Sequence, residues 1–215
     1  MSGSVWQWIY LGIGINSLVT RLTDREFAAL QDDSFLRTKS RVSEKIIETL
    51  AEAEARIKLL VNETTFSFPE GTKIKAGKIS RGENYRGLPY FVLDYPRLFD
   101  SDNMFAYRVI LWWGHEISYT LLLGRQSKER FGPKLLAHRP ELSDWFLCVH
   151  GTPWEHHFGD DNYRPVKVLS DDDFQQHTQE KDFIKLSQKQ PISKLSVLPE
   201  AAADNLAFLL GMLSP

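Results

Sequence analysis

Histidine and acidic side chains are concentrated in one stretch of the chain, residues 150–161. The stretch reads His150-Gly-Thr-Pro-Trp-Glu155-His156-His157-Phe-Gly-Asp160-Asp161. Imidazoles and carboxylates at this density can bind a transition metal or act as general acid and base. The spacing matches neither H-E-x-x-H nor H-x-H, so we predict no tight metal site and no bound cofactor.

Two interpretations of residues 150–161 stay open. In the first, His150, Glu155, His156 and His157 form an acid–base site, which would make the protein an enzyme. In the second, the stretch is a polar surface loop whose Trp154 and Phe158 turn inward over the core.

A second group of candidate residues is basic and aromatic. Around a predicted hairpin the chain carries Lys73, Lys75, Lys78, Arg81, Tyr85, Arg86, Tyr90 and Arg97. Guanidinium groups bind phosphate or carboxylate in bidentate fashion, and tyrosines offer stacking surfaces. Lysines on an edge strand also protect against aggregation, so that role explains them without a ligand. We therefore predict an anionic ligand or partner at Arg81, Tyr85, Arg86, Tyr90 and Arg97.

Other chemically suggestive residues have weaker patterns. The single cysteine, Cys148, lies in an apolar run and excludes an intramolecular disulfide, so we predict a buried structural thiol. His115 and Glu116 form a polar pair at a predicted hairpin tip. Gly12-Ile13-Gly14 is half of a dinucleotide fingerprint, but position 17 is a serine where the third glycine belongs. The chain contains no P-loop, no G-x-S-x-G elbow and no C-x-x-C pair.

Composition places the chain among ordinary globular proteins. Its 215 residues are 42% hydrophobic and 25% charged, which suits one globular domain spanning 1–215. The net charge of -2 makes nucleic acid an unexpected partner. The apolar run from Val5 to Ile15 lacks the flanks of a signal peptide and is shorter than the roughly 20 residues of a membrane span. We expect a cytoplasmic protein without membrane attachment, with residues 5–15 as a buried strand or extended segment.

Helices are predicted near the start of the chain. Thr23-Asp24-Arg25-Glu26 has the form of a capping box and predicts a short helix ending near Asp32. A long helix from about Ser34 to Val61 follows, because its apolar residues recur every three, four or seven positions. These residues are Phe35, Val42, Ile46, Leu50, Ala53, Ile57 and Leu60.

The middle of the chain predicts an antiparallel sheet of at least four strands. Strands are expected at 73–80 and 89–95, joined by a loop at 81–87, and at 105–113 and 117–123. An odd-length connection between the last two places Tyr107, Val109 and Leu111 on one face with Tyr119 and Leu121, whereas an even one scatters them. The apolar face so formed requires the long helix to cover it, and the mixed opposite face requires a second layer over part of it.

The C-terminal third is predicted to be mostly helical. Ser127 to His138 has helical character interrupted at Gly132-Pro133, and 145–150 is expected to form a strand. Ser170 and three aspartates predict a helix running to about Lys189, and Pro199 opens a last helix. Because Phe208 and Met212 lie off the leucine stripe of that last helix, we predict a homodimer through it. The predicted class is α+β, with a long helix from the N-terminal half and C-terminal helices covering the sheet.

Overall fold

The computed structural model describes residues 22–100 and 102–214, so the strand expected at 5–15 lies outside the described residues. The chain divides into two compact units, residues 1–41 and 42–215. Two helices follow the start of the described chain, α1 (Asp24–Gln31) and α2 (Asp33–Glu63). The predicted capping box opens α1: the Thr23 side chain accepts from the Glu26 backbone, and the Glu26 carboxylate accepts from Thr23.

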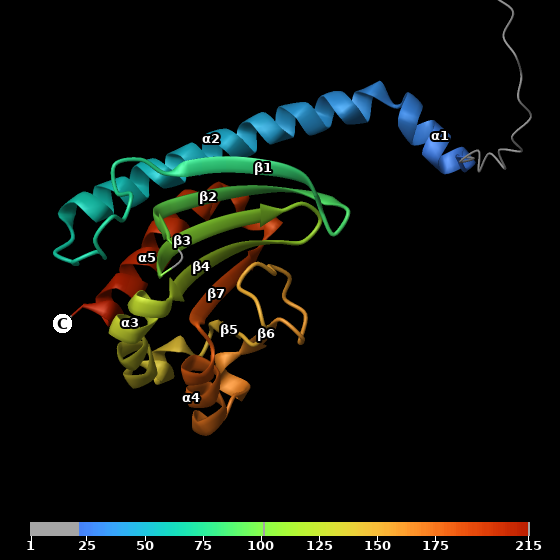
Figure 1. Ribbon diagram of the computed structural model, residues 1–215. Helices are drawn as coiled ribbons and strands as arrows, with labels where there is room; N and C mark the ends of the chain where they lie inside the picture. Colours follow the sequence, from blue (N-terminus) through green and yellow to red (C-terminus); the bar gives the residue numbers. More distant parts are fainter. Residues whose placement is uncertain (1–21, 101, 215) are drawn as a thin grey trace, which may run out of the picture. The chain divides into compact units, whose positions relative to one another are not determined.

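Seven antiparallel strands form the sheet of the unit 42–215, in the order β1-β2-β3-β4-β7-β5-β6 (Figure 1). Their bounds are β1 Lys78–Tyr85, β2 Leu88–Phe99, β3 Asn103–Trp112, β4 Glu116–Gly124, β5 Phe146–Cys148, β6 Tyr163–Pro165 and β7 Phe183–Pro191. The α+β class predicted from the sequence is confirmed, including the antiparallel sheet, the long helix and the C-terminal helices.

One face of the sheet holds the main core, and α2 and α5 (Leu198–Leu213) lie against it (Figure 1). A three-residue turn joins β3 to β4, and it pairs Leu111 with Ile117, Val109 with Tyr119 and Tyr107 with Leu121. The predicted parity is therefore correct, and these side chains are buried together with Ile46, Leu50, Ala53 and Ile57 of α2. Within α2 the predicted stripe is buried only from Ile46 onward, since Phe35 and Val42 are exposed.

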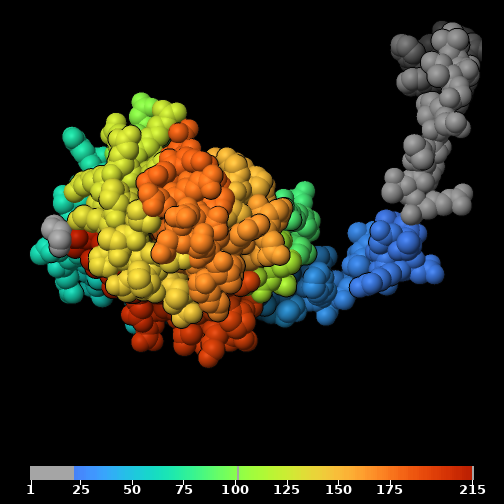
Figure 2. Space-filling model, turned by 90° about the horizontal axis from the view of Figure 1, so that it is seen from below, coloured from blue at the N-terminus to red at the C-terminus, as the bar shows by residue number. Residues whose placement is uncertain are grey.

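Helix α3 (Arg125–Ala137) continues through Pro133, which the sequence predicted as an interruption. It lies beside α4 (Asp171–Glu180), and Figure 2 shows both on one face of the molecule, α3 in yellow and α4 in orange. Short 3₁₀ helices span Arg139–Leu142, Val166–Val168 and Ile192–Val197.

Three predicted element boundaries were wrong. The strand expected at 73–80 begins only at Lys78, and Lys73 forms an isolated bridge with Arg97. The helix that begins after Ser170 ends at Glu180 instead of Lys189, and the following residues form β7 between β4 and β5. Ile184 and Leu186 face the main core while Lys185 faces the other side, which is the period-two alternation of a strand. The loop predicted at 81–87 is instead strand as far as Tyr85, and only Arg86 and Gly87 form the turn, both with positive φ.

Helix α5 uses its apolar side chains inside its own chain. Leu206, Leu209, Leu210 and Met212 are buried in the main core, and the Phe208 ring stacks on Trp145 with ring centroids 5.9 Å apart. The segment Ile192–Leu213 is long and apolar enough for a membrane span by length and composition alone. Core helices of soluble proteins meet the same criterion, and 39% of this apolar window is buried inside the structure.

Candidate functional site

The two groups of candidate residues predicted from the sequence meet in space. Tyr85 ends β1, and the segment between β5 and β6, residues 149–162, crosses the sheet face that α2 leaves uncovered. The Tyr85 hydroxyl donates to Glu155 Oε2 at 3.0 Å and accepts the backbone N–H groups of His156 (2.7 Å) and His157 (3.1 Å). This segment is the second layer that the mixed face of the hairpin predicted.

One hydrogen bond and two longer contacts meet at one carboxylate oxygen at this place, and His157 Nε2 has no hydrogen-bond partner among the described residues. Besides the Tyr85 hydroxyl, Arg86 Nη2 lies 3.5 Å and His157 Nε2 lies 3.7 Å from Glu155 Oε2. His157 Nδ1 accepts from the Gly159 N–H at 3.1 Å, so Nε2 bears the proton of the neutral ring. We call Tyr85, Arg86, Glu155, His156 and His157 the Tyr85 cluster; it already contains its own anion.

Burial sets the protonation of the two histidines in the Tyr85 cluster. It lowers the pKa of His156 to about 2, with the Lys185 and Arg108 cations adding to the effect. It also lowers the pKa of His157, to which Arg86 contributes. Both rings are therefore neutral at physiological pH. His156 is too weak a base to accept a proton there. The histidine–carboxylate pair of the cluster is therefore His157 and Glu155, with Nε2 and Oε2 3.7 Å apart.

Beneath the Tyr85 cluster lies a lysine that the sequence analysis did not single out. Lys185 of β7 is 1% exposed, its amine donates to the Glu155 carbonyl and it lies 4.9 Å from the centre of the Tyr163 ring. Desolvation lowers the pKa of Lys185 to about 8. Polar Lys185 and Ser187 alternate with apolar Ile184 and Leu186, a pattern that indicates a strand with one polar face. The sequence analysis missed this lysine because it predicted a helix over these residues.

Neighbouring polar side chains on the same sheet face are satisfied in pairs. Arg108 contacts Asp94 through two hydrogen bonds of 2.6 and 3.0 Å, and the Thr120 and Ser187 hydroxyls lie 2.8 Å apart. Cys148 is buried, as predicted, and its Sγ lies 3.4 Å from Asn162 Oδ1. Burial raises the pKa of this thiol, so it stays protonated and a poor nucleophile.

Among the residues that the structure describes, several predicted site residues have no polar contact with the Tyr85 cluster, although the Tyr90 ring packs against it. Arg81 pairs with Phe91, which places it on the α2 side of the sheet and away from Tyr85. The Tyr90 ring packs at 6.1 Å from the Tyr85 ring and fills the space over Gly82, where a Cβ atom would lie 2.4 Å from it. His150 Nδ1 accepts from the Thr152 N–H. Trp154, predicted to turn inward, is 49% exposed.

Arg97 lines an open cleft near the other end of β2. Its backbone pairs with Lys73, whose N–H donates to the Arg97 carbonyl at 2.8 Å. The cleft has a volume of 480 Å³, and its lining consists of Gly71, Thr72, Lys73, Ile74, Lys75, Ala76 and Arg97. This lining contains three cations and no carboxylate. Arg97 Nε is buried and has no hydrogen-bond partner among the described residues.

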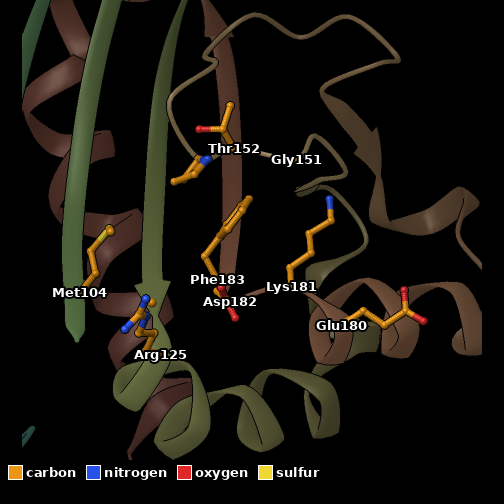
Figure 3. A pocket seen from close by; sticks show the side chains of 10 residues that line it. Met104, Arg125, Gly151, Thr152, Glu180, Lys181, Asp182 and Phe183 are labelled. Atoms are coloured by element: carbon orange, nitrogen blue, oxygen red, sulfur yellow. The ribbon is translucent and has the colours of Figure 1, made fainter. Parts of the chain in front are cut away.

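A second cleft of 490 Å³ lies beside the start of α3 and is drawn in Figure 3. Its lining mixes both signs of charge, with Arg125 and Lys181 beside Glu180 and Asp182. The cations already have partners, because Arg125 contacts Asp102 at 2.7 Å and the Lys181 amine donates to the His150 carbonyl at 2.7 Å. Nothing in this cleft selects one class of ligand.

Residues 22–100 and 102–214 bring no three His, Cys, Asp or Glu side chains close enough to hold a metal ion. Comparison with protein-family models and with curated proteins found no match to this chain.

Proposed function

We propose that the protein is a non-enzymatic binding or accessory protein that holds a small anionic ligand in the cleft lined by Lys73, Lys75 and Arg97. The observation that carries this proposal is the lining of the cleft, which has three cations and no carboxylate. The Nε of Arg97 is also buried without an acceptor among the described residues. A buried donor without a partner costs about 1–3 kcal/mol, and more when the group is charged. A phosphate or carboxylate in the cleft would place acceptor oxygens among the charges of Lys73, Lys75 and Arg97.

The surroundings of Arg97 suit such a ligand. Lys73 and Lys75 add two positive charges, and the lining has no carboxylate to compete for them. Clefts of roughly 300–1,000 Å³ take ligands of metabolite size, a range that includes this one. At the other end of the hairpin, the predicted anion-binding residues Tyr85 and Arg86 already contact the Glu155 carboxylate. An external anion there would have to displace a group tethered to the same chain.

Thermal unfolding with a panel of phosphate, sulfate, citrate and nucleoside monophosphates tests the proposal. We expect at least one anion to raise the melting temperature of the wild-type protein. Arg97→Met should abolish the gain, Arg97→Lys should retain part of it, and added salt should weaken it. Arg86→Met is the matched control at the Tyr85 cluster and should leave the gain intact.

Two outcomes would contradict this assignment. A melting temperature that no anion raises would remove the anionic ligand altogether. A gain lost in Arg86→Met and kept in Arg97→Met would move the ligand to the Tyr85 cluster, with Glu155 displaced from it.

A second candidate function is an enzyme that uses His157 and Glu155 as an acid–base pair. The distance of 3.7 Å from His157 Nε2 to Glu155 Oε2 favours it, because Glu155 is the partly exposed member of the pair. A screen of hydrolysable esters, amides and phosphate esters tests this idea. Activity that falls at least tenfold in both Glu155→Gln and His157→Asn would support it. Activity absent from the wild type, or unchanged in these variants, would remove it.

A further inference from the structure

The first helices of the described chain expose an unusual amount of apolar surface. Helix α1 has no buried residue, and along α1 and the first turns of α2 the side chains of Phe27, Leu30, Phe35 and Leu36 are each between 52% and 67% exposed. Exposed apolar side chains of this size, grouped in one short stretch of the chain, are typical of surfaces that another molecule covers. An eight-residue helix such as α1 is marginal in water on its own, so it also needs packing to persist.

Charge along this segment is divided into two blocks of opposite sign. Residues 24–33 contain four carboxylates and one guanidinium, namely Asp24, Glu26, Asp32, Asp33 and Arg25. Residues 34–41 contain three cations and no carboxylate, namely Arg37, Lys39 and Arg41. The acidic block has a net charge equal and opposite to that of the basic block, so the segment is complementary to itself when a second copy runs in the opposite direction.

We infer that residues 22–41 are a homodimer surface on which two copies of the chain pair in antiparallel orientation. A two-fold axis at the junction of the two blocks, near Asp33, sets the acidic block of each chain beside the basic block of its partner and brings the apolar side chains of both copies together. Such an interface is isologous, as is usual in closed dimers. A parallel pair would set like charges against one another, which is unfavourable.

This surface differs from the one predicted from the sequence, the C-terminal helix. Most apolar side chains of α5 are already buried in their own chain, and Phe208 is partly covered by Trp145. Phe208→Glu therefore serves as the matched control for a glutamate introduced at an exposed phenylalanine.

Light scattering on the full-length chain measures the state of association. Concentrations from roughly 1 μM to 1 mM cover the Kd range of weak to moderate dimers. We expect dimers in the wild type and in Phe208→Glu, and monomers in Leu30→Glu and Phe35→Glu. Circular dichroism and thermal unfolding of each variant show that the unit 42–215 remains folded, so a monomeric mass reflects the lost contact.

A charge-exchange pair makes the test specific for orientation. Chains carrying Asp24→Lys with Asp33→Lys, and chains carrying Arg37→Glu with Arg41→Glu, should each be monomeric, and an equal mixture should form heterodimers. Asp32 is kept, because its Oδ1 accepts from the Phe35 N–H at 2.9 Å at the start of α2. Each variant breaks the Asp33–Arg37 pair within one helix, but both side chains are mostly exposed, so this loss costs at most a few tenths of a kcal/mol.

Three results would overturn the inference. A monomeric wild type at every concentration would exclude the dimer, and binding of that monomer to phospholipid vesicles would identify a lipid surface as the occupant instead. A monomer that dimerises only after deletion of residues 1–21 would show that this segment covers the helices. Dimers lost in Phe208→Glu and retained in Phe35→Glu would return the interface to the C-terminal helix.

Discussion

The Tyr85 hydroxyl lies 3.0 Å from Glu155 Oε2, although 70 residues separate the two along the chain. The same hydroxyl accepts two consecutive backbone N–H groups, from His156 and His157. A single side chain at the end of β1 therefore fixes the middle of the segment that covers the polar face of the sheet.

Replacing Tyr85 by Phe removes these three hydrogen bonds while keeping the ring. At roughly 1 kcal/mol for each bond, with Glu155 still able to contact Arg86 and water, we expect the free energy of unfolding to fall by about 1–3 kcal/mol. Amide exchange in residues 150–162 should accelerate, which hydrogen-exchange mass spectrometry measures. Tyr90→Phe is the control, because the Tyr90 hydroxyl has no hydrogen bond in the described part of the chain and should change neither quantity. Equal effects in both variants would contradict the assigned role of Tyr85.

Leu111 tests the packing of the main core. It is 1% exposed on the face that α2 covers, so Leu111→Ala should lower the free energy of unfolding by about 2–5 kcal/mol in urea denaturation. Leu59 of α2 is 63% exposed, so Leu59→Ala should lower the free energy of unfolding by less than about 0.5 kcal/mol. Similar losses at both sites would show that the sheet face is not the core described above.

Lys185 should make stability depend on alkaline pH. Its pKa is about 8 in the folded chain and close to 10.5 when unfolded. Between these values the unfolded chain binds a proton that the folded chain has released, so the free energy of unfolding rises with pH. Relative to Lys185→Met, the wild type should gain on the order of 2 kcal/mol between pH 8 and 9.5, at about 1.36 kcal/mol per pH unit.

Urea denaturation at several pH values measures that difference, and the comparison with the variant cancels the contribution of other titrating groups. Lys189→Met, on the same strand at an exposed position, is the control and should show no such divergence from the wild type. A difference between wild type and Lys185→Met that stays constant from pH 8 to 9.5 would mean that the Lys185 amine is solvated.

Metal content remains a separate prediction. The spacing of His150, His156 and His157 suits no single ion, and Asp160 and Asp161 follow Gly159. We therefore expect protein purified without chelator to hold well under one equivalent of zinc, iron or manganese by mass spectrometry. Stoichiometric metal that disappears in His157→Asn would overturn this and favour the enzyme.

Sequence patterns were sufficient where one period dominated. The stripe of Ile46, Leu50 and Ile57 predicted the long helix, and the parity argument for Leu111 and Tyr119 predicted which side chains share the core face. The patterns failed at residues 181–189, where polar and apolar side chains alternate but follow directly from a well-capped helix. The first residues of β7 are buried on both faces of the sheet, and this burial favours a strand after Glu180. Such burial depends on the tertiary structure and cannot be read from local sequence.

The candidate site was predictable only in part. Residue types drew attention to Tyr85, Arg86, Glu155 and His157, yet local periodicity does not relate positions 70 residues apart, so their contact was not foreseen. Arg97 and Lys73 were grouped with the hairpin end because they are near it in sequence. The strand register separates them from it, since Arg97 pairs with Ala106 and Tyr90 pairs with Trp112.

The position of β7 has a consequence for how the chain folds. It lies between β4 and β5, so the hairpin of β5 and β6 joins the sheet only through a strand that is synthesised after both. While the ribosome has not yet released residues 183–191, β4 presents an unpaired edge rich in apolar side chains, which is a template for intermolecular pairing. Completion of the sheet must therefore await the last part of the chain, and truncations before Phe183 should aggregate during synthesis instead of yielding a smaller soluble domain.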